Sequence, residues 1–379
     1  MKVVLKKMTL TKFKGIESQT VNFNDACTII SGANGTGKTT LFDAFVWCLF
    51  GKDSSDRKQF NIKTLDKNGV AIPRVTHEVE VVLQADEQTI TLRRCYTEKW
   101  QKKRSSIEEE LTGHEESRYY NDIPLSVAEY SEKINALCKE EVFKMATNPH
   151  YFLSQKDETQ RTMLFRMAGE VSNNEIAKDN TEFAVLLDKL QGKTIEEYKK
   201  EVSAKSKRIK DEIKAIPIRI EEVQYIQAII EKETTNNTAK LLDERIEELK
   251  NQIQTFNKQL EKFEKEEFLI QSFTKAKATA ITDKINALFA NIRFKLFETQ
   301  INGVEVECCK AMINGVPYSD ANNASKINAG LDIINAICKY EGITTPIFID
   351  NAESVNEVLP TKSQQIRLVV TTDKVLNIK

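Results

Sequence analysis

One stretch of the sequence has the residue types and the spacing that bind phosphate. Residues Gly32–Thr39 read Gly-Ala-Asn-Gly-Thr-Gly-Lys-Thr and match the pattern G-x-x-x-x-G-K-[ST] in full. Glycines let successive backbone N–H groups point at phosphate oxygens, Lys38 adds positive charge for the β- and γ-phosphates, and the Thr39 hydroxyl can ligate Mg²⁺. We therefore predict a site for ATP and Mg²⁺ whose nucleotide-binding residues are Gly32, Asn34, Gly35, Thr36, Gly37, Lys38, Thr39 and Thr40.

An acidic residue near the other end of the chain is the candidate for a second Mg²⁺ contact. Asp350 follows the apolar run Pro346–Ile349, which is where a P-loop ATPase places such an acid. A helix N-cap after a strand is the alternative. Compact kinases and small GTPases close their sites with shorter spacing. The distance along the chain therefore suggests a divided domain, with the loop in one half and the acid in the other.

The elements beside the loop fit this prediction. A strand is expected at Cys27–Ile30, and the helix expected at Lys38–Phe50 is apolar almost all round, which is typical of a buried helix. Gly51 should end that helix. Further strands are expected at residues 3–5, 10–13, 19–23, 79–83, 90–92, 347–349 and 368–370, helices at 126–137, 158–167 and 323–340, and turns at 66–69, Asn302-Gly303 and Asn314-Gly315.

The middle of the chain has a different pattern. Apolar residues recur at heptad spacing in two runs, separated by a polar break at Thr234–Thr238. The runs are Ile195, Tyr198, Val202, Ile209, Ile213, Ile216, Ile220 and Val223, then Leu242, Ile246, Leu249, Ile253, Phe256, Leu260 and Phe263. They predict an antiparallel coiled-coil hairpin of roughly 50 Å, with two helices of an ordinary bundle as the alternative. Pro217 should bend or interrupt the first helix.

Composition limits the classes of protein. The net charge of −1 excludes a uniformly basic protein, so any DNA contact must come from a local patch. The candidate patch is Lys99–Arg104 with Arg93 and Arg94 nearby, and a solvated hairpin tip is the alternative. Seven cysteines without a C-x-x-C pair predict free thiols in the cytoplasm. The sequence has no apolar run long enough to span a membrane and no apolar signal core at its N-terminus.

These motifs together resemble the ATPase heads of SbcC-type DNA-repair proteins, which are kin to SMC, RecF and RecN proteins. The resemblance lies in Phe13–Ile16, in Ser31–Ala44 and in Phe348–Asp350, with a coiled hairpin between them. It implies an α/β fold, a P-loop NTPase head of the ABC type built from N- and C-terminal halves. The halves would be residues 1–190 and 270–379, and the inserted arm residues 191–269.

The resemblance also implies a mode of action. Two ATP molecules would be sandwiched in a homodimer that closes with ATP and reopens on hydrolysis. The dimer would gate the access of DNA to a nuclease resembling SbcD, in repair or recombination. An SMC- or RecF-like ATP-dependent clamp or assembly switch with little hydrolysis is the alternative. A transporter nucleotide-binding domain fits less well, because heptads are inserted and a Ser-Gly-Gly signature is lacking. A P-loop kinase would need a lid with arginines, not a coiled arm, between the P-loop and the acid.

Some functional residues are assigned by the resemblance alone. Gln155 falls where the family has the glutamine that touches Mg²⁺ and the attacking water, and Gln160 is the second candidate. A solvated glutamine near a helix start is the other interpretation. Ser319 falls where the family has a signature serine facing the nucleotide of a second subunit, although Asp320 and Ala321 replace the usual glycines. An ordinary helix cap is the alternative for Ser319.

Two further departures concern hydrolysis and the arm. Asn351 stands where the family has a glutamate that activates water, Glu353 is the nearby carboxylate that could substitute, and Thr372 stands where the family has a switch histidine. Loss of a base typically costs on the order of 10² to 10⁴ in rate, so slow hydrolysis is expected. The arm is short and has no C-x-x-C, so we expect no zinc hook. A naturally short arm and a shortened one both remain possible interpretations.

Overall fold

The structure is a computed structural model that describes residues 1–102, 109–230, 236–300 and 305–379. It divides into two compact units. The first contains Met1–Met167, Ile285–Lys295 and Cys309–Lys379, and the second contains Ala168–Lys284 and Leu296–Cys308. The boundaries predicted at residues 190 and 270 stay predictions. A segment that leaves the first unit and returns to it is the arrangement expected for an inserted arm.

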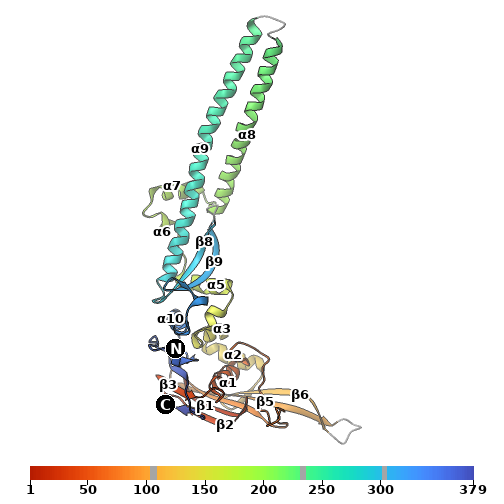
Figure 1. The fold of residues 1–379 in the computed structure, drawn as a ribbon, viewed down its shortest axis with the longest axis vertical. Coiled ribbons are helices and arrows are strands. Elements are labelled where there is room, and N and C mark those ends of the chain that lie inside the picture. The colour runs from red at the N-terminus through yellow and green to blue at the C-terminus, as the bar shows by residue number, and fades with distance from the viewer. Residues whose placement is uncertain (103–108, 231–235, 301–304) are drawn as a thin grey trace. The chain divides into compact units, whose positions relative to one another are not determined.

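An antiparallel sheet forms one layer of the first unit (Figure 1). Its strands, in spatial order, are β2 (Ile16–Asn22), β1 (Val3–Phe13), β4 (His77–Ala85), β5 (Gln88–Lys102), β6 (Glu109–Tyr120) and β7 (Ile123–Leu125). The predicted pair around residues 81 and 92 is confirmed, because Val81 lies opposite Leu92. The prediction of separate strands at residues 3–5 and 10–13 was wrong. A bulge at Lys6, between Leu5 and Lys7, shifts the register by one residue, and β1 pairs with β4 on both sides of it.

A mainly parallel sheet forms the second layer and carries the loop. Its order is β11 (Ile347–Ile349), β12 (Gln365–Val370), β3 (Cys27–Gly32) and β13 (Asn377–Ile378), with β13 alone antiparallel. Helix α1 (Lys38–Phe50) is buried over almost all of its residues, and the αL residue Gly51 ends it, as predicted. The rings of Phe42 on α1 and Phe348 on β11 stack 4.6 Å apart. The core of this unit therefore joins residues from both ends of the chain.

Further elements are short helices and a small sheet. The helices are α2 (Val127–Leu137), α3 (Glu140–Thr147), α4 (Tyr151–Ser154), α5 (Asp157–Ala168) and α10 (Asn323–Glu341), and the small sheet has the order β10 (Val316–Pro317), β9 (Glu305–Ile313) and β8 (Ile292–Thr299). The capping box of Ser126 and Glu129 is present as predicted. Asn314 and Gly315 both have positive φ in the turn between β9 and β10, as predicted. The turn expected at Asn302-Gly303 lies outside the described residues.

The second unit contains two long helices that run side by side (Figure 1). They are α8 (Ile195–Ile230) and α9 (Asn236–Asn286), preceded by α6 (Asn173–Ala177) and α7 (Thr181–Leu190). Lys210 forms an ion pair with Glu264 at 3.2 Å, and Gln227 donates a hydrogen bond to Asp243 at 3.1 Å. These pairs show that α8 and α9 are antiparallel. Of the expected polar break, residues from Asn236 onward belong to α9, and the rest lies outside the described residues.

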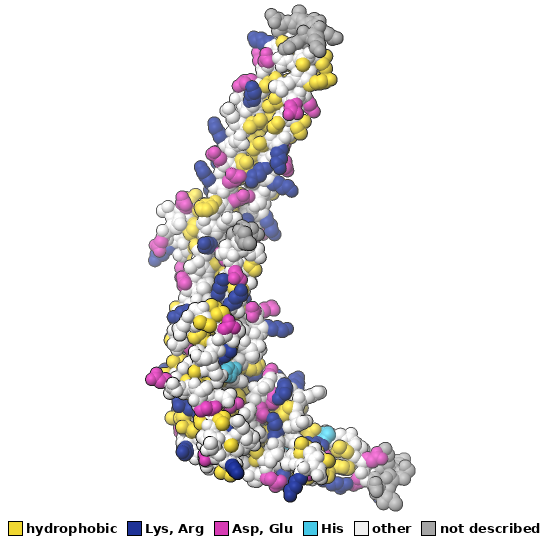
Figure 2. All heavy atoms as spheres, in the orientation of Figure 1, with side chains coloured by type: hydrophobic (Ala, Val, Ile, Leu, Met, Phe, Trp, Pro, Cys, Tyr) yellow, Lys and Arg dark blue, Asp and Glu magenta, His cyan; other side chains and the backbone are white. Residues whose placement is uncertain are grey.

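The predicted seam lies between these helices. Figure 2 shows hydrophobic side chains along the line between α8 and α9, with Lys, Arg, Asp and Glu on the outer faces. Ile216 on α8 and Leu249 on α9 are almost fully buried. Helix α8 continues through Pro217, so an interruption at this residue was wrong, while the alternative of a bend there stays a prediction. The burial of the neighbouring Ile216 offsets the hydrogen bond that a proline removes from a helix.

Two predictions about the whole chain can also be compared with the structure. All seven cysteines are free thiols, as expected. Burial raises the pKa of Cys48 to about 12, which keeps that thiol protonated. In the part of the chain that the structure describes, no helix combines the length and the apolar character needed to cross a membrane.

Candidate ATP-binding site

The phosphate-binding loop joins the end of β3 to the start of α1. Gly35 and Gly37 have φ values of 83° and 98°, which favour glycine. A Cβ atom on Gly32 would lie 2.6 Å from Thr36 Oγ1 and 3.2 Å from the Val375 carbonyl oxygen, so a larger residue would have to displace the Thr36 side chain. Gly37 is the N-cap of α1, and the first N–H groups of a helix form a natural anion site. The loop therefore has the backbone shape that the motif predicts.

Lys38 lies across this loop. Its Nζ donates hydrogen bonds to the main-chain oxygens of Gly32 at 2.7 Å and Ala33 at 2.9 Å. The loop is further held from outside, because Ala33 N donates to the carbonyl oxygen of Asp373 at 2.6 Å. Asn34, Gly35 and Thr39 are exposed, and Thr36, Gly37 and Thr40 are half-buried. The structure therefore places the predicted nucleotide-binding residues around one continuous loop.

Asp350 and Thr39 are brought together. Thr39 Oγ1 donates a hydrogen bond to Asp350 Oδ2 at 3.1 Å, although the residues are 311 positions apart. The sheet explains the contact, because β3 and β11 are parallel to the strand β12 between them and their carboxyl ends meet at one edge. A hydroxyl and a carboxylate are oxygen ligands of the kind Mg²⁺ prefers. This pair fits a divalent cation at the end of the phosphate-binding loop.

The residues after Asp350 are held in a fixed turn. Asn351 has a φ of 53°, and its N–H donates to Asp350 Oδ1 at 2.9 Å. Glu353 Oε2 accepts a hydrogen bond from the Val370 N–H at 3.0 Å, at the carboxyl end of β12. The carboxylate of Glu353 therefore lies at the same sheet edge as the loop, and one of its two oxygens is engaged by the backbone.

Gln155 lies at the end of α4, and its side-chain amide turns back on that helix. Nε2 donates to the carbonyl oxygen of Tyr151 at 3.1 Å and to Ser154 Oγ at 3.3 Å. The described residues show no hydrogen bond from Gln155 to Thr39 or Asp350. Gln160, the second candidate, is buried and donates to the carbonyl oxygen of Gln155 at 2.8 Å. The structure thus makes Gln160 a support for the Gln155 segment.

Ser319 lies in a short 3₁₀ turn, η1 (Tyr318–Asp320), before α10. Its Oγ donates to Asp320 Oδ1 at 2.9 Å, and its carbonyl oxygen accepts from Lys326 Nζ at 2.9 Å. Ser319 is exposed. The alternative that it caps α10 was wrong, because the N-cap is Asn322, whose side chain accepts from Ser325 N.

The structure adds residues that sequence reasoning missed. Asp43 on α1 is buried and accepts hydrogen bonds from Lys14 Nζ at 2.5 Å and Ser54 Oγ at 2.6 Å. One signal was available, because Asp43 is the one acid in an otherwise largely apolar helix. Lys14 belongs to the Phe13–Ile16 motif, whose turn gives it a φ of 47°. These contacts fix the segments on both sides of the P-loop helix.

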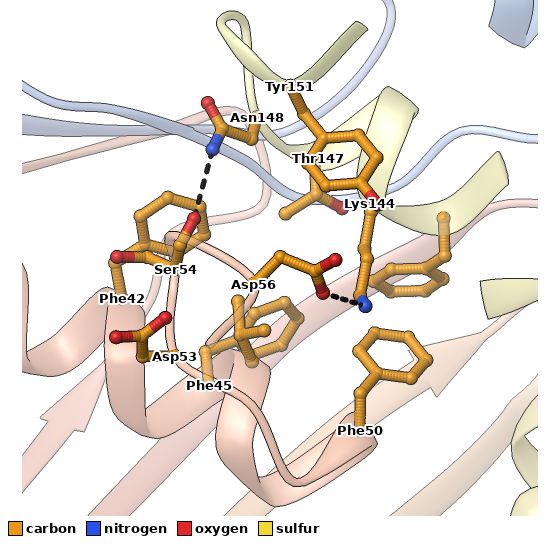
Figure 3. Close-up of a pocket in the computed structure, with 12 residues that line it drawn as sticks. Phe42, Phe45, Phe50, Asp53, Ser54, Asp56, Lys144, Thr147, Asn148 and Tyr151 are labelled. Carbon is orange, nitrogen blue, oxygen red and sulfur yellow. Dashed lines mark hydrogen bonds and ion pairs between the residues drawn. The ribbon is translucent and has the colours of Figure 1, made fainter. Parts of the chain in front are cut away.

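A small pocket lined by α1, the loop after it and α3–α4 adjoins Ser54 (Figure 3). In it Asn148 Nδ2 donates to the Ser54 carbonyl oxygen at 3.4 Å, and Lys144 forms ion pairs of 2.5 Å with both Asp56 and Glu140. Burial alone would raise the pKa of Asp56. Hydrogen bonds from Lys144 and Lys52 outweigh that effect and leave the pKa below its ordinary value. The loop after α1 is therefore tied to α3.

Only some residues of the candidate DNA patch are both described by the structure and exposed on the surface. Lys103 and Arg104 lie outside the described residues. Arg94 is 4% exposed, and its Nε donates to the Cys48 carbonyl oxygen, so its assignment to a surface patch was wrong. Trp100 is engaged within the head, because Arg74 lies 4.7 Å over its ring and its Nε1 donates to Glu98. Further cations of the described patch are Lys99, which pairs with Glu115 at 3.5 Å, and Lys102 and Arg93.

The loop, the parallel sheet and the acid at its edge define a P-loop ATPase domain, here divided by a long helical insertion. Residues 7–293 match the AAA domain family, and the chain belongs to that family. The predicted class, an SbcC/SMC-like ABC-type ATPase head with an α/β fold, is confirmed.

Two curated proteins are similar to parts of the chain. The SbcC subunit of the nuclease SbcCD from Staphylococcus saprophyticus is 40% identical over 63 residues, which are 15% of this chain and 6% of that protein. The DNA repair protein RecN of Halalkalibacterium halodurans is 30% identical over 99 residues, which are 25% of this chain and 18% of that protein. The chain thus matches only a small part of the length of either relative.

Solved structures resemble the chain over nearly its full length, but distantly. The Smc head domain with an extended coiled coil, bound to the C-terminal domain of ScpA and derived from Pyrococcus furiosus, has 15% sequence identity and a TM-score of 0.46, and the match covers 100% of this chain and 96% of that one. The recombination mediator protein RecF with ATP has 13% identity and a TM-score of 0.39, with coverage of 100% and 98%.

Proposed function

We propose that this chain binds ATP with Mg²⁺ at the P-loop and hydrolyses it slowly. The observation that supports this most is the hydrogen bond of 3.1 Å between Thr39 Oγ1 and Asp350 Oδ2. These two oxygen ligands would hold Mg²⁺, with Gln155 as a further ligand once its amide leaves the α4 turn. When bound, the ion would neutralise charge on the β- and γ-phosphates.

Lys38 and the loop would bind the triphosphate. The two carbonyl oxygens that now accept from Lys38 Nζ belong to the same loop, so a phosphate oxygen at this point would replace them as the acceptor. The N–H groups of Gly35, Thr36, Gly37 and Thr39 would add neutral donors. The positive end of the α1 dipole acts in the same direction.

Slow turnover is expected from the residues that follow Asp350. Asn351 cannot act as a general base, and the carboxylate of Glu353 is the candidate that replaces it. Its Oε2 is engaged by Val370 N, which leaves Oε1 to accept a proton from water. Glu353→Gln keeps an acceptor for Val370 but removes the base. We expect it to lower kcat on the order of 10²-fold while ATP affinity changes little.

The test is a steady-state ATPase assay with Mg²⁺, in which Lys38→Ala is the control. Turnover of the wild-type chain well above that of Lys38→Ala supports the ATPase. If the wild-type chain turns over ATP no faster than Lys38→Ala, the proposal that it hydrolyses ATP is wrong. Calorimetry with ATP tests binding separately, because a chain that binds but does not turn over would still show a Lys38-dependent binding heat.

Two copies of the chain would enclose the nucleotides. Ser319 is exposed, and the described residues show no contact between it and the P-loop of the same chain. A second chain would therefore bring its Ser319 to the γ-phosphate, and ATP would stabilise the dimer. Light scattering after gel filtration, with and without ATP, tests this point. The expected result is a doubled mass in ATP that Lys38→Ala abolishes.

The biological work would be that of an SbcC-like protein in DNA repair or recombination, with the dimer gating DNA for a nuclease resembling SbcD. A second candidate is an ATP-dependent clamp or assembly switch with little hydrolysis. Two residues favour the second candidate. Asn351 has no carboxylate that could act as a general base, and Asp320 places an acid beside Ser319. A chain that dimerises in ATP but does not hydrolyse it would support the second candidate, the clamp or assembly switch.

A further inference from the structure

The segment that leads to Gln155 lies directly against α10. A Cβ atom added to Gly330, in the middle of α10, would lie 2.0 Å from the carbonyl oxygen of Pro149 and 2.7 Å from its Cβ. Atoms at those distances overlap, so only glycine allows this packing. The backbone of α10 and the backbone at Pro149 are therefore in contact without a side chain between them.

The same segment is tied on its other side to the P-loop helix. Asn148 Nδ2 donates to the carbonyl oxygen of Ser54 (Figure 3). Ser54 Oγ donates to Asp43 Oδ1 on α1. Asn148 Oδ1 in turn accepts from the His150 N–H at 2.9 Å. Residues 148–150 thus have one anchor on α1, which begins at Lys38, and another on α10.

His150 makes a specific contact with the turn that holds Ser319. Its Nδ1 lies 3.2 Å from the hydroxyl oxygen of Tyr318. Burial lowers the pKa of His150 below its ordinary value, against a smaller opposing effect of Asp350, so the neutral ring is favoured and Nδ1 can accept the hydroxyl proton. Tyr318 is the residue before Ser319. Lys326 lies 5.5 Å over the Tyr318 ring and donates to the Ser319 carbonyl oxygen.

We infer that His150 and Tyr318 form a positioning pair, which sets the place of Ser319 from the P-loop side of the same chain. Neither side chain would touch the nucleotide of its own P-loop. The pair would transmit a movement of the Gln155 segment to the surface that meets the second copy. This inference rests on the proposed function, since Ser319 is assigned there to the partner's nucleotide. The physical link consists of the Pro149–Gly330 packing and one hydrogen bond.

The test uses the full chain and three single substitutions. Tyr318→Phe removes one hydroxyl, His150→Leu removes the ring nitrogens, and His150→Asn restores a polar atom near the place of Nδ1. Tyr340→Phe is the matched control, because Tyr340 is an exposed tyrosine on α10 whose ring packs against Arg166. Each variant is compared for ATP affinity, for the association constant of the dimer in ATP, and for hydrogen exchange of residues 316–328 with and without ATP and Mg²⁺.

We expect Tyr318→Phe and His150→Leu each to weaken association in ATP by about fivefold, the factor for one neutral hydrogen bond. The double variant, Tyr318→Phe with His150→Leu, should associate no more weakly than either single variant, because both substitutions remove the same contact. ATP affinity of the monomer should stay within about twofold of the wild type, and His150→Asn should recover part of the loss. A merely structural role would instead lower melting temperature and ATP affinity together.

Two results would contradict the inference that His150 and Tyr318 form a positioning pair. One is a double variant whose losses multiply. The other is an ATP-dependent change in hydrogen exchange at residues 316–328 that is the same in Tyr318→Phe, His150→Leu and the wild type. The exchange measurement is made in dilute samples as well, so that it reports on a single chain. If the wild type stays monomeric in ATP, the proposed dimer fails, while the exchange measurement still decides whether His150 and Tyr318 are coupled to the P-loop.

Discussion

The contact between Gly330 and Pro149 makes a quantitative prediction. In Gly330→Ala the new Cβ would lie 2.0 Å from the Pro149 carbonyl oxygen, whereas Cβ atoms essentially never lie nearer than 3.0 Å to another heavy atom. α10 and the Pro149 segment must therefore separate by about 1 Å, the difference between those distances. Overpacking costs ~1–3 kcal/mol where a side chain can give way. The obstacle here is backbone, so we expect the upper end, ~3 kcal/mol or more.

A loss of this size should lower the melting temperature by about 6–12 °C, since each kcal/mol shifts a domain of this size by about 2–4 °C. Thermal unfolding followed by circular dichroism measures it. Gly113→Ala is the matched control, because a Cβ atom there meets no heavy atom within 4 Å. Its melting temperature should stay within about 1 °C of the wild type. Equal melting temperatures for the two variants would refute the argument from close packing.

Three further predictions concern charge. Asp350→Asn should raise the Mg²⁺ concentration needed for ATP binding by roughly 10- to 100-fold, because a charged ligand becomes neutral, and a Mg²⁺ titration of ATP binding measures this. Hydrogen bonds from Lys63, from the Arg74 N–H and from Trp100 lower the pKa of Glu98 to about 2, so its carboxylate stabilises the fold at pH values above its ordinary pKa. Glu98→Gln should therefore lower the free energy of unfolding in urea by ~1–3 kcal/mol at pH 7. The difference from the wild type should shrink as the pH falls from about 4.5 towards 2. If the β5–β6 hairpin binds duplex DNA, Lys99→Gln with Lys102→Gln should reduce the salt slope of binding by about 1.8.

Each of these predictions can fail. If Asp350→Asn does not change the Mg²⁺ concentration needed for ATP binding, Asp350 is not a ligand of the metal. A difference between Glu98→Gln and the wild type that persists at low pH would show that the carboxylate is not the group that stabilises. An unchanged salt slope would show that Lys99 and Lys102 do not contact DNA phosphates and belong to a solvated hairpin tip. Lys58→Gln with Lys67→Gln is the control for DNA binding, since both are exposed lysines outside the hairpin.

The part of the site nearest to the motif could be predicted from the sequence. The pattern Gly32–Thr39 specifies its own backbone shape, and an apolar strand followed by an acid fixes Asp350 at the carboxyl edge of a parallel sheet. These are local signals combined with one rule of sheet geometry. The edge therefore brings Thr39 and Asp350 together although almost the whole chain separates them.

The contacts around Asn148 and His150 could not be predicted in that way. The hydrogen bond from Asn148 joins it to Ser54, 94 positions earlier, and the contact of His150 joins it to Tyr318, 168 positions later. Neither pair has a local pattern, because each depends on how helices pack. The errors have the same origin. Arg94 has the sequence character of a surface cation, but its place on β5 turns it towards the Cys48 carbonyl oxygen.

The order of strands β11, β12, β3 and β13 has a consequence for synthesis. Both neighbours of β3 in its sheet come from the last residues of the chain, Gln365–Val370 and Asn377–Ile378. While a ribosome makes the arm, β3 has none of its sheet partners, and both edges of this apolar strand are open to mispairing. The predicted nucleotide site is also incomplete during that time, because Asp350 has not yet been made. We therefore expect nascent chains to need protection until β12 and β13 have been made.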